Sequence, residues 1–344
     1  MGAWNYPLQL VLSPMVAALS AGNCVVLKPS ELAEATSQLL ATLIPKYMDT
    51  GAITVYEGGV EETTALLKQR FDYIMYTGSE NVGKIVMRAA SEHLTPVTLE
   101  LGGKSPCVVA ADSNLKVTAD RIVWGKFMNA GQTCIAPDYI LVEKSASKEL
   151  IEELSQSLQR QYGEQPAKSN DYGRIINSRH FNRIHSYLEE QKAAVIHGGH
   201  VNAEDNFIAP TLMLNPSLDS RIMQEEIFGP VLPIIEYESL EEAIAFINKR
   251  EKPLALYLFT NSDGKIKQVS QQTSSGTLCI NDAVIFMVNH DLPFGGVGNS
   301  GMGAYHGKWG FDTFSHLKPI MHRSFLGDVP VRYAPYTPLK QKII

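Results

Sequence analysis

Strand and helix patterns alternate along the first third of the chain, and this alternation constrains the fold more than any other feature. Short apolar runs typical of strands are separated by single segments with helical spacing. The predicted strands are 24–27, 53–56, 73–76 and 97–101, and the predicted helices are 32–43, 61–68 and 81–90. Strands joined through single helices form a parallel, doubly wound sheet that binds ligands beyond the carboxyl ends of its strands. We therefore predict an α/β fold, with ligand contacts at Lys28 and at 77–79.

A second α/β region is expected from 104 to 319. It contains a predicted strand at 139–142 and predicted helices at 147–161, 179–191 and 240–248. A chain of 344 residues exceeds one typical core, which favours two domains. The predicted organisation is a first domain at 1–103, a second at 104–319 and a tail at 320–344.

The opening segment, 1–27, carries no charged side chain. A signal peptide has basic residues before its apolar stretch, whereas the first cation here is Lys28. A spanning helix needs about 20 consecutive apolar residues, and Pro14 and Gly22 interrupt this run. We therefore expect no membrane span, but a short helix with Ser13 as N-cap, Pro14 at its first position and Gly22 at its end.

Composition narrows the class of protein. The formal net charge of −6 and the lack of a basic patch argue against a nucleic-acid partner. The cysteines are widely spaced without a CxxC pair, which is typical of free thiols in a reducing cytosol; they are Cys24, Cys107, Cys134 and Cys279. All but Cys134 lie in apolar runs and are expected to be small buried side chains. The expected location is cytoplasmic.

The segment FMNAGQTC at 127–134 places Cys134 after a turn of small residues and polar residues that can order a backbone. A reactive cysteine needs an accessible sulfur and backbone N–H groups aimed where negative charge develops. Glu100 precedes it in the segment LELGGK at 99–104, between two leucines. A thiol with a carboxylate in apolar surroundings favours covalent catalysis followed by base-assisted hydrolysis.

Other motif matches are weaker. The segment 296–301 fits GxGxxG, but it neither follows a clear strand nor opens a βαβ unit with an acidic residue about 20 positions on. The segment 103–105 resembles the end of a P-loop, but Thr98 stands where the first glycine is required. His197 and His200 are expected to be solvated, so no metal site is predicted.

Cys134 and Glu100 lie in motifs of a known family. FMNAGQTC resembles the nucleophile motif of the NAD(P)-dependent aldehyde dehydrogenases, and LELGGKS resembles their glutamate motif. Further motifs agree in order: WNYP at 4–7, KPSE at 28–31, TGS at 77–79, QEEIFGP at 224–230 and PFGG at 293–296. KFMN at 126–129, APDY at 136–139, DYGRIIN at 171–177 and GNSGMGAYHGK at 298–308 resemble the class 3 branch, which contains fatty aldehyde dehydrogenases.

The resemblance, which covers about residues 2–324, implies three catalytic roles. Cys134 matches the nucleophile that forms a thiohemiacetal and, after hydride transfer, a thioester. Asn5 matches the amide that stabilises the oxyanion together with the Cys134 backbone N–H. Glu100 matches the base that activates water for hydrolysis, and its leucine neighbours favour a raised pKa.

Binding roles are implied in the same way. Lys28 and Glu31 match residues at the adenine ribose, and Glu226 and Phe228 match residues at the nicotinamide ribose and ring. Gly78 and Ser79 lie where a helix N-terminus approaches the pyrophosphate. Taken alone, Lys28 also fits a surface lysine and Glu226 a loop cap. Tyr6 and Phe294 are expected at the substrate entrance, although either could serve packing.

The expected function is oxidation of medium or long aliphatic, or aromatic, aldehydes to acids with NAD or NADP. Relatives of this kind are dimers, so a homodimer is expected. The resemblance also implies that roughly the first hundred residues of the family are missing, which would leave a sheet edge and an apolar face uncovered. A fragment, a misassigned start and a natural short form all fit. The alternative functions are an impaired paralogue acting as a binding or structural subunit, and a cofactor-free esterase.

Overall fold

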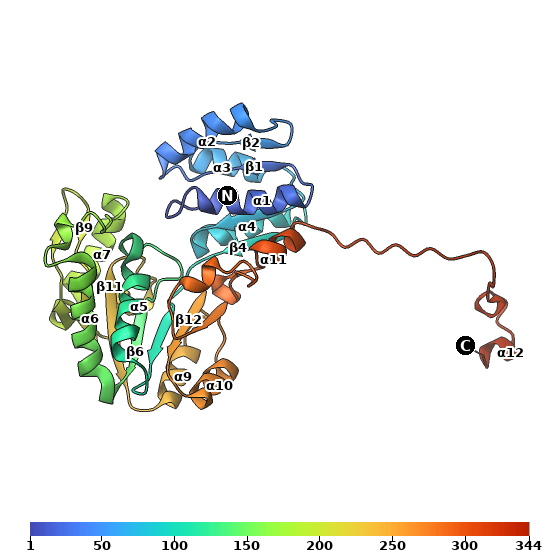
Figure 1. The fold of residues 1–344 in the computed structure, drawn as a ribbon. Coiled ribbons are helices and arrows are strands. Elements are labelled where there is room, and N and C mark those ends of the chain that lie inside the picture. Colours follow the sequence, from blue (N-terminus) through green and yellow to red (C-terminus); the bar gives the residue numbers. More distant parts are fainter. Residues whose placement is uncertain (344) are drawn as a thin grey trace. The chain divides into compact units, whose positions relative to one another are not determined.

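The computed structural model describes residues 1–343 (Figure 1). Its α/β fold confirms the predicted class. Met1–Phe314 forms one unit, and a second unit begins at Ser315. The elements of the first region are α1 (Gln9–Ser20), β1 (Val25–Leu27), α2 (Glu34–Tyr47), β2 (Ile53–Val55), α3 (Val60–Leu67), β3 (Ile74–Thr77), α4 (Glu80–Ser91) and β4 (Val97–Glu100). These are the predicted strands and helices with small shifts at their ends, preceded by α1.

The predicted parallel pairing is present, but the strands are divided between two sheets. β1 pairs with β2, and β3 pairs with β4. The first two residues lie between these sheets, because the Thr77 N–H donates to the Met1 carbonyl (3.1 Å) and the Gly2 N–H donates to the Lys28 carbonyl (3.1 Å). The carboxyl ends of β1 and β3 are therefore linked through this short segment.

The predicted start of the first helix is wrong. α1 begins at Gln9, and Pro14 lies in its interior rather than at its first position. The first helical turn forms earlier in the chain, because the Leu10 N–H donates to the Tyr6 carbonyl at 3.0 Å. An internal proline removes one helical hydrogen bond, and burial of one face of α1, through Val11, Met15 and Ala18, offsets that loss.

The helical spacing of Leu32, Ala35, Leu39, Leu40 and Leu43 predicts one apolar face for the helix at 32–43, but most of that face is exposed. Leu40 is buried together with Ser37 and Ile44, whereas Leu39 is 51% exposed and Leu32 and Leu43 also face solvent. The cause is the narrow two-stranded sheet of β1 and β2, which covers only one stripe of the helix.

The second region contains a seven-stranded sheet in the order β13-β12-β5-β6-β11-β10-β7. All neighbouring pairs are parallel except β10 with β7. Its strands are β5 (Pro106–Val109), β6 (Tyr139–Glu143), β7 (Val195–His197), β10 (Thr211–Leu214), β11 (Val231–Tyr237), β12 (Ala255–Phe259) and β13 (Thr277–Ile280). A separate hairpin joins β8 (Val201–Asn202) and β9 (Phe207–Ile208).

Helices cover this sheet, and Figure 1 shows α5 and α6 running along it. The helices are α5 (Leu115–Phe127), α6 (Ser147–Tyr162), α7 (Ser178–Glu190), α8 (Arg221–Gln224), α9 (Leu240–Asn248) and α10 (Asp263–Gln272). The helix α11 (Gly307–Thr313) packs instead on α1. The predicted strand at 139–142 and the three predicted helices correspond to β6, α6, α7 and α9. The main hydrophobic core lies between the helices and the sheet.

The glycine-dense loop at 295–303 packs against the end of β4. Its strand β14 (Gly301–Met302) pairs antiparallel with β4, placing Gly301 opposite Glu100. A Cβ atom on Gly301 would lie 2.0 Å from the Leu99 carbonyl oxygen. These glycines therefore allow two backbones to approach closely.

The cysteine expectations hold in part. Cys107 is fully buried in β5 and Cys279 is half-buried in β13, but Cys24 is exposed, so its predicted burial is wrong. Cys24 lies just before β1, where the chain is still in the turn that follows α1.

The second unit contains the short helix α12 (Pro338–Gln341). The proposed domain boundary at 103/104 stays a prediction. Within residues 1–343, none of the helices combines the length and apolar character that crossing a bilayer requires.

Candidate active site

The chain that precedes Cys134 makes a left-handed turn in the 3-10 segment η1 (Met128–Gly131). Asn129, Ala130 and Gly131 have φ angles of 53°, 51° and 74°. Left-handed backbone at a residue such as alanine costs roughly 1–2 kcal/mol, and strain of this kind gathers at functional sites.

Gln132 anchors this turn from inside the protein. Its side chain is 2% exposed. Its amide nitrogen donates to the Asn129 and Arg174 carbonyls, both at 3.0 Å, and its amide oxygen accepts from the Ile176 N–H at 2.9 Å. The expectation that polar residues order the backbone before Cys134 is therefore met by a fully satisfied glutamine.

Predicted residues from four distant segments line one narrow cavity of about 30 Å³. They are Asn5, Tyr6, Glu100, Cys134 and Phe294, and the remaining lining residues are Gln9, Leu10, Thr77, Thr133, Ile135, Met287, Tyr305 and His306. This volume is enough for about one or two water molecules. The cavity thus places a thiol, a carboxylate and an amide around a space the size of a small reacting group.

The Cys134 thiol is half-buried and held in its neutral form. Burial, followed by the charges of Glu226 and Glu100, raises its pKa to about 12. Two carboxylates near the sulfur oppose formation of a thiolate, so the thiol needs a proton acceptor or a nearby positive charge to react near neutral pH.

Glu100 ends β4 with its carboxylate buried. Neither of its carboxylate oxygens has a hydrogen-bond partner among the described residues. Burial raises its pKa well above the ordinary value for glutamate, as its neighbours Leu99 and Leu101, both buried, led us to expect. A carboxyl group of this kind can take a proton from water more readily than an exposed one.

Asn5 and Tyr6 face the nucleophile turn from the segment before α1. The Asn5 side-chain amide donates to the Gln132 carbonyl at 3.1 Å. The Tyr6 hydroxyl lies 2.7 Å from the Thr133 hydroxyl oxygen. Both side chains are therefore held beside Cys134, the predicted nucleophile.

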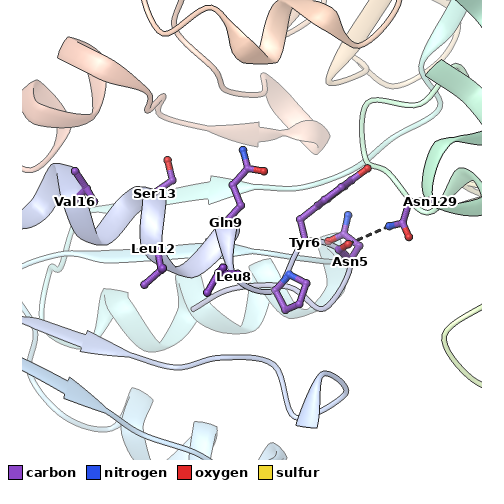
Figure 2. A pocket seen from close by; sticks show the side chains of 9 residues that line it. Asn5, Tyr6, Leu8, Gln9, Leu12, Ser13, Val16 and Asn129 are labelled. Carbon is purple, nitrogen blue, oxygen red and sulfur yellow. Dashed lines mark hydrogen bonds between the residues drawn. The ribbon is translucent and has the colours of Figure 1, made fainter. Parts of the chain in front are cut away.

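A larger groove of about 720 Å³ opens beside this cavity along α1. Figure 2 shows its lining, which is Asn5, Tyr6, Pro7, Leu8, Gln9, Leu12, Ser13, Val16 and Asn129. Three of these residues, Asn5, Tyr6 and Gln9, also line the narrow cavity. The volume lies in the range of ligand sites in proteins, and the wall formed by α1 is largely apolar.

The predicted adenine-side residues lie at the carboxyl end of β1. Lys28 is buried, and its ammonium group donates to the Pro29 carbonyl at 2.8 Å. It also lies 3.7 Å from the carboxylate of Glu31, which is exposed. The alternative of a surface lysine at position 28 is wrong, because only 4% of the residue is exposed.

Gly78 and Ser79 join β3 to α4. Ser79 is the N-cap residue, and its hydroxyl accepts a long hydrogen bond of 3.5 Å from the Val82 N–H. A Cβ atom on Gly78 would lie 2.1 Å from the Tyr76 hydroxyl oxygen, so a larger residue there would have to displace the Tyr76 ring. The first turn of α4 carries the free N–H groups and positive dipole end that suit a pyrophosphate.

Glu226 lies close to the nucleophile. Its carboxylate packs on Gly102, where a Cβ atom would lie 2.2 Å from Oε2, and it accepts from the Gly103 N–H. Burial, followed by the charge of Asp138, raises its pKa to about 8. Gly102 and Gly103 therefore form a cradle that holds the Glu226 carboxylate.

Phe228 has a φ angle of 45°, which is strained for an aromatic residue. Its ring packs edge-on against Trp4, with ring centroids 5.4 Å apart. Phe228 therefore lies next to the Asn5 segment, on the side of the site where Glu226 also lies.

Several lining residues were not predicted to act there. Tyr305 and His306 pack on Phe294, with centroid distances of 5.6 and 5.0 Å. Burial, followed by His290, lowers the pKa of His306 to about 4, so its imidazole is neutral near neutral pH. Tyr305 and His306 lie far from Cys134 in the sequence, but both stand in the segment GNSGMGAYHGK at 298–308, which could have pointed to them. Thr133 likewise lies within the nucleophile motif.

Across residues 1–343 the structure holds no group of three or more side chains of the kind that ligate metals. The donor set of the site, one thiol with carboxylates and amides, is suited to nucleophilic and acid–base chemistry.

Comparison with known proteins agrees with this chemistry. The sequence model described as the aldehyde dehydrogenase family matches residues 1–320. A rat protein named aldehyde dehydrogenase, dimeric NADP-preferring, is 56% identical over 97% of this chain and 74% of its own length. Rat aldehyde dehydrogenase family 3 member A2 is 54% identical over 97% of this chain and 69% of its own. The substrate-bound structure of Staphylococcus aureus AldH has a TM-score of 0.95 at 49% identity, covering 98% of this chain and 74% of that one.

Proposed function

The chain belongs to the aldehyde dehydrogenase family, and from that premise we propose that Cys134, Asn5 and Glu100 together convert an aldehyde into a carboxylate. NAD or NADP is the cofactor of this enzyme. The observation that carries the proposal is the convergence of the three side chains on one narrow cavity.

Cys134 acts as the nucleophile in the proposed reaction. Its thiol first loses its proton to water; the sulfur then forms a bond to the aldehyde carbon, and the carbonyl electron pair moves to oxygen, giving the oxyanion of a thiohemiacetal. The Asn5 amide and the Cys134 backbone N–H donate to that oxyanion. The bound cofactor, when present, supplies the hydride acceptor that turns this intermediate into a thioester.

Glu100 serves the second half of the reaction. Its carboxylate takes a proton from a water molecule, whose oxygen adds to the thioester carbon. The carbon–sulfur bond then breaks to give the carboxylic acid and the Cys134 thiolate, and the proton of the acid passes to the sulfur as the carboxylate product leaves. Burial of Glu100 supports this role, since the raised pKa makes it a stronger base.

The cofactor-binding residues proposed from the motifs are Lys28, Glu31, Gly78, Ser79, Glu226 and Phe228. Three features support them: the free N-terminus of α4, the carboxyl ends of β1 and β3, and the cradle of Gly102 and Gly103 beneath Glu226. Lys28 and Glu31 would bind the adenine ribose, and Glu226 and Phe228 would lie at the nicotinamide ribose and ring.

The proposed substrates are medium or long aliphatic, or aromatic, aldehydes. The groove along α1 supports this class because Leu8, Leu12 and Val16 give it an apolar wall beside Tyr6. Phe294, which also lines the catalytic cavity, adds a further apolar surface. We also propose a homodimer, since the rat relative is named as dimeric.

The activity is tested by NAD(P)H formation with dodecanal and benzaldehyde. Asn5→Ala should lower kcat by about 10²–10³-fold if its amide donates to the oxyanion. Cys134→Ser should abolish oxidation while leaving cofactor binding measurable. A wild-type chain that forms no NAD(P)H with any aldehyde contradicts the proposal.

The substrate class needs its own test. Leu12→Glu places a charge on the apolar wall and should lower kcat/KM for dodecanal about tenfold or more, with a smaller effect on acetaldehyde. The matched control is Leu39→Glu, because Leu39 is exposed on α2 away from the groove. Equal losses for both aldehydes would show that the groove does not bind the alkyl chain.

A further inference from the structure

We propose that Asn129 is a positioning residue of the oxyanion site, and that its side-chain amide sets the spacing between Asn5 and the turn carrying Cys134. This inference rests on the proposed function, since it concerns the oxyanion formed at Cys134. Asn129 touches neither the thiol nor the Glu100 carboxylate in any recorded hydrogen bond; it acts through Asn5.

The Asn129 amide bridges two segments that are distant in the sequence. Its nitrogen donates to the Asn5 carbonyl at 3.0 Å and to the Gln132 carbonyl at 3.3 Å. Figure 2 shows the first of these contacts. A primary amide has two N–H groups, so this amide can donate to both carbonyls, and the Asn129 side chain also lies within hydrogen-bonding reach of Tyr6. The bridge therefore fixes the segment before α1 against the nucleophile turn.

The oxyanion donor depends on the same carbonyl. The Asn5 amide donates to the Gln132 carbonyl at 3.1 Å, which uses one of its two N–H groups. The second N–H of Asn5 is left for the substrate oxygen. Because Gln132 lies two positions before Cys134, this bond sets the Asn5 amide relative to the Cys134 backbone N–H. The Gln132 carbonyl accepts from both asparagines, one for each of its lone pairs.

The two sides of this bridge differ in how firmly they are held. The nucleophile turn is anchored by the Gln132 side chain and by contact of Gly131 with Gly229, where a Cβ atom on Gly131 would lie 2.3 Å from the Gly229 oxygen. The Asn5 segment is irregular and precedes α1. Asn129 therefore holds the irregular Asn5 segment against the anchored nucleophile turn.

Two requirements restrict the residue type at position 129: a left-handed backbone and a side chain that donates hydrogen bonds. A φ angle of 53° favours asparagine, aspartate or glycine over other residues. Among these three, only asparagine supplies N–H donors from its side chain. Glycine and aspartate therefore remove the bridge while keeping a residue that tolerates the left-handed backbone.

The experiment compares Asn129→Gly and Asn129→Asp with wild type. A small displacement of a catalytic group can cost about 100-fold in rate, and we expect kcat to fall about 10-fold to 100-fold in Asn129→Gly, with cofactor Kd unchanged. Asn129→Asp should lose more, because its carboxylate faces two carbonyl oxygens. A melting curve confirms that each variant is folded.

The matched control is Asn215→Gly. Asn215 is also left-handed, with a φ angle of 46°, and its amide also joins two segments, by donating to Glu236 at 3.1 Å. It is exposed and does not line either pocket. Its kcat should stay within about twofold of wild type.

A double-mutant cycle separates positioning from a general loss of structure. If Asn129 acts through Asn5, Asn129→Gly should cost less than about threefold in a chain that already carries Asn5→Ala. An equal loss in both backgrounds would overturn the inference, as would an unchanged kcat in Asn129→Gly alone.

A cofactor-free reaction distinguishes this inference from the proposed function. With p-nitrophenyl acetate, the Cys134 sulfur adds to the ester carbonyl, an oxyanion forms at the same place, and p-nitrophenolate leaves as the carbonyl is restored. Ester hydrolysis that falls in Asn129→Gly, in a chain that oxidises no aldehyde, upholds the inference and overturns the proposed function. If the chain oxidises aldehydes and Asn129→Gly leaves that rate unchanged, the proposed function stands and the inference about Asn129 is overturned. A chain with neither activity overturns both.

Discussion

The Cys134 thiol has its pKa raised to about 12 by burial and then by the charges of Glu226 and Glu100. Below that pKa, the thiolate fraction grows about tenfold with each pH unit. We expect the rate of iodoacetamide alkylation at Cys134, followed by mass spectrometry of its peptide, to keep rising through pH 10 in the cofactor-free protein. A rate that levels off near pH 8.5 or 9, as for an ordinary thiol, would show that the sulfur is not held neutral.

The buried Glu100 carboxylate destabilises the folded protein as pH rises. Its pKa is raised in the folded chain, so the folded state binds more protons than the unfolded state as pH rises above the ordinary glutamate pKa. Stability from this group is present at low pH and is lost as pH rises. Glu100→Gln should therefore gain free energy of unfolding relative to wild type, by up to about 1.4 kcal/mol per pH unit above pH 5.

Urea unfolding of Glu100→Gln and wild type at pH 5, 6, 7 and 8 measures this effect. The control is Glu61→Gln, because Glu61 is exposed in the first turn of α3. A difference between Glu100→Gln and wild type that stays constant with pH would contradict the raised pKa.

At the scale of elements, local signals predicted α4 well and α1 poorly. Ser79 caps α4, and its apolar face follows helical spacing through Val86 and Ala90, so the sequence carries both the start and the buried stripe. α1 has no side-chain cap, and its start is set by the turn at Tyr6. The usual preference of proline for a first turn therefore misplaced its beginning.

The contact between α1 and α11 gives a test at this scale. A Cβ atom on Gly310 of α11 would lie 2.9 Å from the Ala17 Cβ atom of α1. Gly310→Ala should destabilise the protein by about 1–3 kcal/mol through overpacking, despite the higher helix propensity of alanine. It should also lower kcat/KM, since the Asn5 segment lies just before α1 and His306 lies just before α11.

The control for Gly310→Ala is Gly264→Ala in α10. The nearest atom to its added Cβ would be the Ser262 hydroxyl oxygen at 3.6 Å, an ordinary contact. This variant should gain up to about 1 kcal/mol from helix propensity alone. Similar effects of the two substitutions on urea unfolding would show that α1 and α11 are not closely packed.

At the scale of the molecule, the order of strands and helices was predictable, but their grouping into sheets was not. Alternating patterns identify single elements, whereas the division of β1–β4 between two sheets depends on pairings such as that of β4 with β14, which is distant in the sequence. The same limit applies to the site. Motifs predicted Cys134 and Glu100 as catalytic residues, whereas the place of Tyr305 and His306 in the cavity depends on the bridge between Phe294 and Tyr305.

Cofactor binding should stabilise the whole of Met1–Phe314. The proposed cofactor residues come from both regions, with Lys28 and Ser79 in the first and Glu226 in the second. A ligand at about 100 times its Kd adds about 2.7 kcal/mol to the free energy of unfolding, and here it should raise a single melting transition. Two transitions, of which NADP shifts only one, would contradict binding by both regions.

The same melting experiments test whether the predicted adenine-ribose site prefers NAD or NADP. Glu31 is exposed and carries a negative charge 3.7 Å from Lys28, so it should oppose the 2′-phosphate of NADP. Glu31→Gln should raise the affinity for NADP relative to NAD, by about 2–10-fold for one charge near the surface. The shift should shrink at high salt, because screening weakens an exposed charge. An unchanged ratio of the two Kd values would place Glu31 away from the adenine ribose.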